Sequence, residues 1–195
     1  MNDASKKIYI SHSENDTLKL GQELGKNILP GVTVLLYGDL GTGKTVLVRG
    51  VGEALKISGV RSPSFTLINE YQSQTGIFLI HSDLYRLDEN GASMLGLEEF
   101  SGASDSVLFI EWPERWKNLP VNDVIKIFLK SLNEFEREIK ISASGLKAQE
   151  IIKNLSLYDP PLIPPLRRGD ESIGNIKLAP PVKGERAASG EGVNK

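Results

Sequence analysis

One short segment constrains this chain more than any other part of its sequence. The run GDLGTGKT, from Gly38 to Thr45, fits the pattern G-x-x-x-x-G-K-[ST], which is the Walker A sequence of phosphate-binding loops. An apolar, β-branched run from Val32 to Tyr37 precedes it, and a helical pattern from Lys44 to about Leu55 follows it. A strand before and a helix after are the context in which this pattern forms a P-loop. The alternative is a plain glycine-rich turn between a strand and a helix.

The residue types in this segment match the chemistry of a bound nucleotide. Glycine lets backbone N–H groups approach and wrap a phosphate, and the N-terminus of the following helix adds free N–H groups and a positive dipole end. Lys44 can reach the β- and γ-phosphates, and the hydroxyl of Thr45 can bind Mg²⁺. We therefore expect ATP with Mg²⁺ as the ligand. The loop residues expected to bind it are Gly38, Asp39, Leu40, Gly41, Thr42, Gly43, Lys44 and Thr45.

Two acidic residues follow buried apolar runs, where a P-loop nucleotidase carries the carboxylate that orients its magnesium. Glu111 follows the run Val107–Ile110, and Asp83 follows the run Ile77–Ile80 after two intervening residues. Each carboxylate can bind metal directly, hold a metal-bound water, or polarise the attacking water, and the sequence does not divide these roles. Either could instead be an acid that caps a turn. Thr45, Glu111 and Asp83 are the expected metal residues.

Two further segments are candidates for a response to the nucleotide. The segment Ser62–Thr66 is rich in hydroxyls and follows the first strand–loop–helix unit. Ser64 or Thr66 in such a loop can sense the γ-phosphate and its metal, although a Ser-Pro turn is the ordinary interpretation. Trp112 directly follows Glu111, where it can shield the phosphates or stack on a base. It can equally be a core residue, as large aromatic side chains usually are.

The pattern of apolar residues predicts a three-layer α/β P-loop fold with a mostly parallel, mixed central sheet. Asp16 or Thr17 is expected to cap the first helix. The expected strands are 7–11, 32–37, 67–72, 76–81, 107–110, 121–129 and 136–142, and the expected helices begin near residue 16 and then span about 44–55, 92–100 and 148–157.

The composition changes near residue 157. The predicted ATPase domain spans residues 1–157, and residues 158–195 contain six of the ten prolines and no Phe or Trp. Such a segment buries too little apolar surface to offset the entropy of ordering, so we predict a disordered tail. It has either no binding role or the role of a proline-rich ligand.

The overall composition excludes several classes of function. The chain has no cysteine, which removes disulfides and thiolate chemistry, and its two histidines, far apart in sequence, do not suggest a metal site. A net charge of −2 gives no sign of a nucleic-acid surface. Residues 1–9 lack the apolar core of a secretory signal, and no apolar run approaches the ~20 residues that cross a bilayer. We expect a cytoplasmic protein.

Four ordered blocks of this sequence resemble the bacterial TsaE (YjeE) ATPase family. The blocks are residues 37–50 around the P-loop, Ser62–Tyr71 (SPSFTLINEY), His81–Leu87 (HSDLYRL) and Ile110–Glu114 (IEWPE). The stretch Ser13–Gly21 is also similar to the opening of that family, and the resemblance covers roughly residues 7–142. The family usually has Thr at the position of Ser64, which keeps a hydroxyl, and a bulky residue at the position of Ser82.

The resemblance implies specific roles. Lys44 would hold phosphates, Thr45 and Glu111 would handle Mg²⁺ with Asp83 near them, and Thr17 would lie near the adenine or ribose. Thr66 and Trp112 would belong to the nucleotide-responsive region. The implied process is N6-threonylcarbamoyladenosine (t6A) modification of tRNA, in which ATP turnover resets a TsaB–TsaD partner complex and tRNA is met only through these partners. The expected catalytic residues are Lys44, Thr45, Thr66, Asp83 and Glu111.

Other classes of P-loop protein are alternatives. A small-molecule kinase needs an acceptor pocket and usually an arginine-bearing lid, and the sequence shows no clear lid insertion. A module that senses ATP but hydrolyses little would differ from the partner-driving ATPase described above only in its rate of ATP turnover. A GTPase is the least supported, because the sequence contains no Asn-Lys-x-Asp element for guanine.

Overall fold

A computed structural model describes residues 6–116, 119 and 121–156. The predicted C-terminal tail, residues 158–195, lies outside the described residues. None of the helices in the described ranges is long and apolar enough to cross a membrane.

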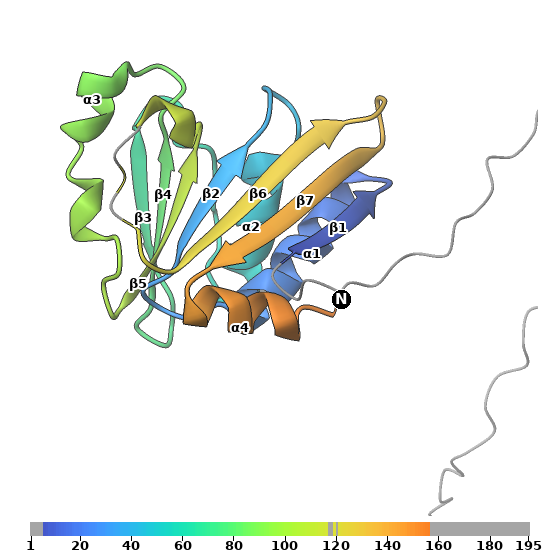
Figure 1. The fold of residues 1–195 in the computed structure, drawn as a ribbon, viewed down its shortest axis with the longest axis horizontal. Helices are drawn as coiled ribbons and strands as arrows, with labels where there is room; N and C mark the ends of the chain where they lie inside the picture. Colours follow the sequence, from blue (N-terminus) through green and yellow to red (C-terminus); the bar gives the residue numbers. More distant parts are fainter. Residues whose placement is uncertain (1–5, 117–118, 120, 157–195) are drawn as a thin grey trace, which may run out of the picture. The chain divides into compact units, whose positions relative to one another are not determined.

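A seven-stranded mixed sheet forms the centre of the fold, in the order β1-β7-β6-β2-β5-β4-β3 (Figure 1). Strands β6, β2, β5 and β4 are parallel neighbours, and the outer pairs β1–β7, β7–β6 and β4–β3 are antiparallel. The α/β fold class with a mixed sheet is therefore confirmed. The strands are β1 (Lys6–Ser11), β2 (Thr33–Tyr37), β3 (Ile68–Gln72), β4 (Phe78–Asp83), β5 (Ser106–Glu111), β6 (Val124–Ser131) and β7 (Arg137–Ser144).

Helices pack on both faces of this sheet. The larger hydrophobic cluster joins one sheet face to α1 (Glu14–Asn27), α2 (Lys44–Ala54) and α4 (Leu146–Asn154). The smaller cluster joins the opposite face to α3 (Glu89–Ser93) and to the 3-10 helix η1 (Leu97–Glu99). A second 3-10 helix, η2 (Pro113–Arg115), directly follows β5. The sheet thus has helical layers on both sides, as the three-layer prediction requires.

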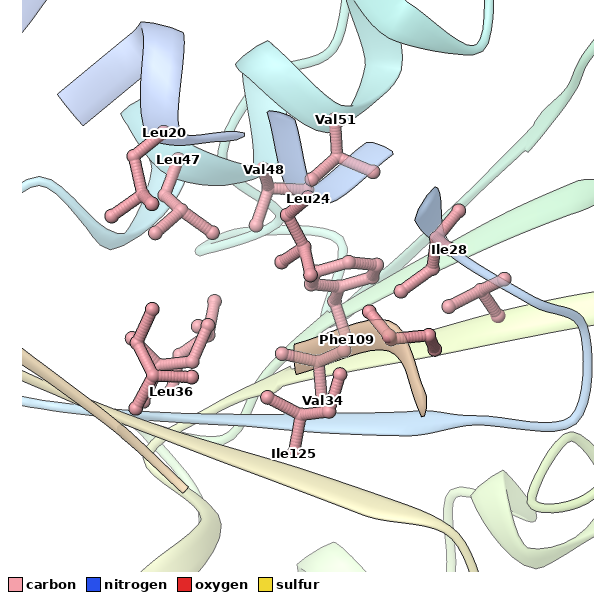
Figure 2. Packing of buried hydrophobic residues seen from close by; sticks show 14 of the residues in the cluster. Leu20, Leu24, Ile28, Val34, Leu36, Leu47, Val48, Val51, Phe109 and Ile125 are labelled. Carbon is pink, nitrogen blue, oxygen red and sulfur yellow. The ribbon is translucent and has the colours of Figure 1, made fainter. Parts of the chain in front are cut away.

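Strand β2 shows why the P-loop lies at the centre of the molecule. Val34 and Leu36 point into the larger cluster and Leu35 points into the smaller one. A strand buried on both faces reads as a continuous apolar run, which is the pattern seen in the sequence. Figure 2 shows side chains of α1 and α2, among them Leu24 and Val48, packed toward the β-strand side chains of Leu36 and Phe109.

Helices α1 and α2 approach each other at glycines. A Cβ atom added to Gly21 would lie 2.1 Å from the carbonyl oxygen of Leu47, and one added to Gly50 would lie 2.1 Å from the carbonyl oxygen of Leu18. Neither distance is possible for a real side chain, so the two helix backbones are in direct contact there. This contact fixes the position of α2, which carries the P-loop at its N-terminus.

The structure corrects the predicted start of the first helix. Ser13 is the N-cap of α1, and its hydroxyl accepts a hydrogen bond from the backbone N–H of Asp16 at 3.1 Å. The prediction that Asp16 or Thr17 caps this helix is wrong. Asp16 lies inside the first turn and accepts from the backbone N–H of His12 at 3.1 Å, and Thr17 is buried. The cap lies earlier because Ser13 already offers the acceptor that the exposed N–H groups need.

Three other predicted boundaries also differ from the structure. The helix predicted over residues 92–100 is wrong in extent: α3 is capped by Asp88 and ends at Ser93, and η1 follows after Gly96, whose φ is 69°. A left-handed residue at this position interrupts a helix. The last helix begins at Leu146 rather than near 148 and ends at Asn154, and β6 begins at Val124 rather than at 121.

Candidate active site

The P-loop connects β2 to α2 with a backbone that only glycine adopts easily. Gly38 has φ 138° and Gly43, the N-cap of α2, has φ 102°. Within the described ranges, no side chain caps α2 and no acidic residue occupies its first turn. The N-terminal N–H groups of α2 are therefore not used by a side-chain acceptor, which is the arrangement that binds an anion.

Lys44 is a buried cation at the base of this loop. Its side-chain nitrogen donates hydrogen bonds to the carbonyl oxygens of Gly38 at 2.6 Å and Asp39 at 2.9 Å. The same nitrogen lies 4.5 Å from the ring centroid of Trp112. Burial lowers the pKa of the Lys44 amine, and the charges of Glu111 and Asp83 oppose that shift. The lysine charge is thus held by dipoles, a ring face and nearby carboxylates.

Glu111 lies at the end of β5, and its Oε1 atom accepts two hydrogen bonds. The hydroxyl of Thr45 donates at 2.9 Å, and His81 Nε2 lies 3.0 Å from the same oxygen. Burial alone would raise the pKa of the Glu111 carboxyl, but the hydrogen bonds from His81 and Thr45 and the charge of Lys44 lower it below its ordinary value. Glu111 is therefore a carboxylate at neutral pH.

Asp83 lies beside Glu111, because the two residues are register partners at the ends of β4 and β5. The hydroxyl of Ser64 donates to Asp83 Oδ2 at 2.7 Å, and the backbone N–H of Tyr85 donates to Oδ1 at 3.0 Å. Parallel neighbouring strands end at the same edge of the sheet. The two carboxylates predicted from separate apolar runs therefore meet in one site.

A cavity of about 290 Å³ unites these groups. It is lined by Leu40, Gly41, Gly43, Lys44, Thr45, Val46, Ser62, Ser64, Asp83 and Glu111. A larger hollow of about 770 Å³ lies along β3 and the loop before it. None of the residues that line this larger hollow belongs to the P-loop, so the smaller cavity is the candidate active site.

Two of the other predicted nucleotide-binding residues also lie close to the P-loop. Thr17 is buried, 2.8 Å from Ser11 between the two hydroxyl oxygens, and a Cβ atom on Gly43 would lie 3.5 Å from its methyl group. Trp112 has a left-handed backbone with φ 59°, and its buried Nε1 has no hydrogen-bond partner among the described residues. It packs at 4.9 Å from the ring of Tyr85.

Thr66 is the predicted catalytic residue that the structure does not bring to the cavity. It is exposed, its hydroxyl donates to Asn69 Oδ1 at 2.8 Å, and it lines the larger hollow. Ser64, two residues earlier, contacts Asp83 instead. Of the two hydroxyls that the sequence offered as a sensor, the one nearest the carboxylates in this structure is Ser64.

His81 was not among the predicted site residues, although it contacts the site directly. It is 0% exposed and lies two residues before Asp83 on β4. Because side chains alternate along a strand, His81 and Asp83 point to the same face. This two-residue spacing on a strand is the signal in the sequence that points to the contact.

The site offers few protein ligands for a metal. In the ranges that the structure describes, there is no group of three or more His, Cys, Asp or Glu side chains arranged to hold an ion. Thr45, Glu111 and Asp83 supply hydroxyl and carboxylate oxygens beside the P-loop. Mg²⁺ keeps several waters and binds through one or two carboxylates and substrate phosphates, so this sparse oxygen set fits a magnesium that arrives with a nucleotide.

Comparison with known proteins identifies the family. The model of the family described as "Threonylcarbamoyl adenosine biosynthesis protein TsaE" matches residues 11–139. This chain belongs to the TsaE family. The match contains every predicted site residue and ends within β7, before α4 begins. The resemblance seen in four sequence blocks is thus confirmed.

Curated relatives extend the TsaE match to most of their own length. A protein of a Nostoc strain named tRNA threonylcarbamoyladenosine biosynthesis protein TsaE is 38% identical over 154 residues, covering 77% of this chain and 93% of the relative. One of the same name from Aquifex aeolicus is 40% identical over 138 residues, covering 69% and 95%. The crystal structure of Bacillus subtilis YdiB matches with a TM-score of 0.66 and 27% identity, covering 77% of this chain and 94% of that one.

Proposed function

We propose that this TsaE-family chain binds ATP with Mg²⁺ and hydrolyses it. The observation that carries the proposal is the convergence of Lys44, Thr45, Asp83 and Glu111 on one cavity at the N-terminus of α2. P-loop nucleotidases use a lysine, a hydroxyl and a strand-end carboxylate in this way. The proposal covers the cofactors ATP and Mg²⁺ as well as the reaction.

The P-loop residues would hold the phosphates. The free N–H groups at the start of α2 would donate to phosphate oxygens. Lys44 would exchange its hydrogen bonds to the carbonyl oxygens of Gly38 and Asp39 for bonds to the β- and γ-phosphates. Thr17, packed against Gly43, would lie beside the rest of the nucleotide.

Thr45, Glu111 and Asp83 would hold the magnesium and its waters. When bound, Mg²⁺ neutralises charge that develops on the phosphate oxygens. The Thr45 hydroxyl donates its hydrogen bond to Glu111 Oε1, and its oxygen lone pairs would stay free for the metal. Both oxygens of Asp83 already accept hydrogen bonds, from Ser64 and Tyr85.

The hydrogen bonds favour a division of roles that the sequence left open. Both described donors of Glu111, Thr45 and His81, reach Oε1. Oε2 accepts neither of these hydrogen bonds, and Glu111 is one of the residues that line the cavity. We therefore propose that Glu111, besides its contact with the metal's waters, orients and polarises the attacking water, whereas Asp83 serves the metal's water shell alone. Ionised Glu111 can accept a proton from that water.

The biological role rests on the relatives. Proteins similar to this chain are named for tRNA threonylcarbamoyladenosine biosynthesis. We propose that the chain serves t6A modification in the cytoplasm by resetting a TsaB–TsaD-like complex through ATP turnover. The net charge of −2 supports contact with tRNA through these partners rather than alone.

Reconstitution tests this function. ATP hydrolysis by the purified chain is measured alone and with TsaB–TsaD partners and tRNA, and modified tRNA is counted in the same reactions. We expect slow turnover alone and repeated rounds of modification only when the intact chain is present. Modification that is indifferent to the chain, while ATP is still consumed, would remove the partner role. A search for phosphorylated small molecules would then test the kinase alternative.

A further inference from the structure

A buried histidine lies beneath the candidate active site and has only one hydrogen-bond partner in the described part of the chain. His81 is fully buried on β4, and its Nε2 lies 3.0 Å from Glu111 Oε1. Its other ring nitrogen, Nδ1, is buried without a partner among the described residues. A histidine held only for packing ordinarily has both nitrogens satisfied.

We infer that His81 is a positioning residue, which holds the Glu111 carboxylate through an Nε2–H hydrogen bond and thereby directs Oε2 toward the cavity. The inference deepens the proposed ATPase function and rests on it. It assigns a role to a side chain that is not among the residues lining the cavity. The role is carried entirely by the orientation of a neighbouring carboxylate.

The chemistry of the partner fixes the tautomer. An ionised carboxylate can only accept hydrogen bonds, so the proton of this pair must be on Nε2. Nδ1 then carries a lone pair. A proton on Nε2 is therefore what this hydrogen bond requires.

Two donors on one oxygen give the carboxylate a fixed orientation. Thr45, from α2, and His81, from β4, reach Oε1 at 2.9 and 3.0 Å. They come from different layers of the fold, so the carboxylate is held between helix and sheet. Loss of the His81 donor would leave the Thr45 hydroxyl as the only described donor to the Glu111 carboxylate. That hydroxyl is also expected to bind the metal.

The tautomer can be read directly in the protein without ligand. The chain contains only two histidines, His12 and His81, so ring ¹⁵N NMR signals are assignable with a His12→Gln variant. We expect His81 to carry a proton on Nε2. A protonated Nδ1 with a bare Nε2, or a ring that exchanges between tautomers, would overturn the inference whatever the activity of the protein.

Three variants separate positioning from packing. His81→Leu removes the donor, His81→Gln keeps an N–H donor near the position of Nε2, and Ile80→Val disturbs the same strand on the opposite sheet face. In His81→Leu we expect kcat to fall about tenfold to a hundredfold, the size of effect of one hydrogen bond to a charged group. KM should change by less than about threefold, and His81→Gln should restore much of kcat.

Binding and stability complete the test. The gain in ADP affinity on adding Mg²⁺ should shrink in His81→Leu and persist in Ile80→Val, although both variants lower the unfolding temperature. If kcat and this magnesium effect are unchanged in His81→Leu, or if both simply follow stability across all three variants, the inference fails. A wild-type chain that does not hydrolyse ATP would contradict the proposed function instead. The tautomer measurement would still test whether His81 donates a hydrogen bond to Glu111.

Discussion

Lys44 and Glu111 are buried, oppositely charged side chains, each only 4% exposed. A buried charge is tolerated when hydrogen bonds and opposite charges surround it. Lys44 has two carbonyl acceptors and the Trp112 ring, and Glu111 has the donors of Thr45 and His81. Each of these residues is therefore kept charged by its own set of partners, and each can be tested separately.

Replacing Lys44 tests the phosphate contacts. Lys44→Ala should weaken ATP binding about tenfold to a hundredfold, because hydrogen bonds to a charged group contribute roughly 1.5–3 kcal/mol. Turnover should fall further if the lysine also stabilises the transition state. Calorimetric titration with ATP and Mg²⁺ measures the affinity. Lys126→Ala, which removes an exposed lysine from β6, is the matched control, and equal affinities in both variants would refute the P-loop assignment.

Glu111 makes a prediction about acid stability. Its folded pKa lies below the ordinary value of 4.5, so its ionisation stabilises the fold fully above about pH 4.5, and this contribution is lost as the pH falls through the folded pKa. The stability difference between wild type and Glu111→Gln should therefore shrink as the pH is lowered from neutral to below 4.5. Urea unfolding in EDTA without nucleotide measures it. A difference that stays constant or grows on acidification contradicts the expected pKa direction.

The sequence predicted these charged residues because their types and spacing are fixed by phosphate chemistry. It did not predict the partners that hold them. Thr66 lies outside the cavity while Ser64 reaches Asp83, and nothing in a run of hydroxyl residues distinguishes one from the other. The hydrogen bond of His81 depends on strands β4 and β5 being neighbours, which is a property of the folded sheet.

At the scale of elements, the packing of α1 against α2 determines where the P-loop lies. Both helices were predicted from apolar periodicity, but the close contact at Gly21 and Gly50 was not. Glycine in a helix interior is locally unfavourable. These two glycines therefore stabilise the fold only through the close contact between the helices that they allow. The local pattern between Ala92 and Phe100 predicted one continuous helix, whereas α3 ends at Ser93 and η1 begins at Leu97.

Substitution of two glycines on α2 tests this packing. Gly50→Ala should destabilise the protein by about 1–3 kcal/mol or more, as overpacking does, because the new methyl group would meet the backbone of Leu18 at 2.1 Å. Gly52→Ala should cost less, since its methyl group would meet the movable side chain of Val60 at 2.6 Å. Thermal and urea unfolding compare the two. A Gly50 variant at least as stable as the Gly52 variant would contradict the packing.

At the scale of the whole molecule, the strand order could not be read from the sequence. β2 lies between β5 and β6, and β7 returns between β6 and β1. Apolar periodicity identifies a strand but does not specify its neighbours, because pairing joins residues far apart in the chain. The α/β class was predictable, since alternating strand and helix patterns favour it.

Truncation tests the predicted domain boundary. Among the residues that the structure describes, the buried members of both hydrophobic clusters lie between Tyr9 and Leu155. A chain ending at residue 157 should therefore match the full chain in unfolding temperature and ATP affinity. A chain ending at residue 144 lacks α4 and should lose several kcal/mol, because each fully buried large aliphatic side chain, such as Ile151 or Ile152, contributes about 1.5–3 kcal/mol. A large loss already in the longer truncation would move the boundary.

The hydrogen bonds of Lys44 to the loop's own carbonyl groups have a consequence for the energetics of ligand capture. The loop holds its shape by internal bonds of the same kind that a phosphate would supply. Binding is then an exchange reaction, in which a ligand must outcompete two peptide carbonyls at one ammonium group. Because the loop is already ordered, little conformational freedom is lost in that exchange, and discrimination depends on formal negative charge, which a phosphate has and a carbonyl lacks.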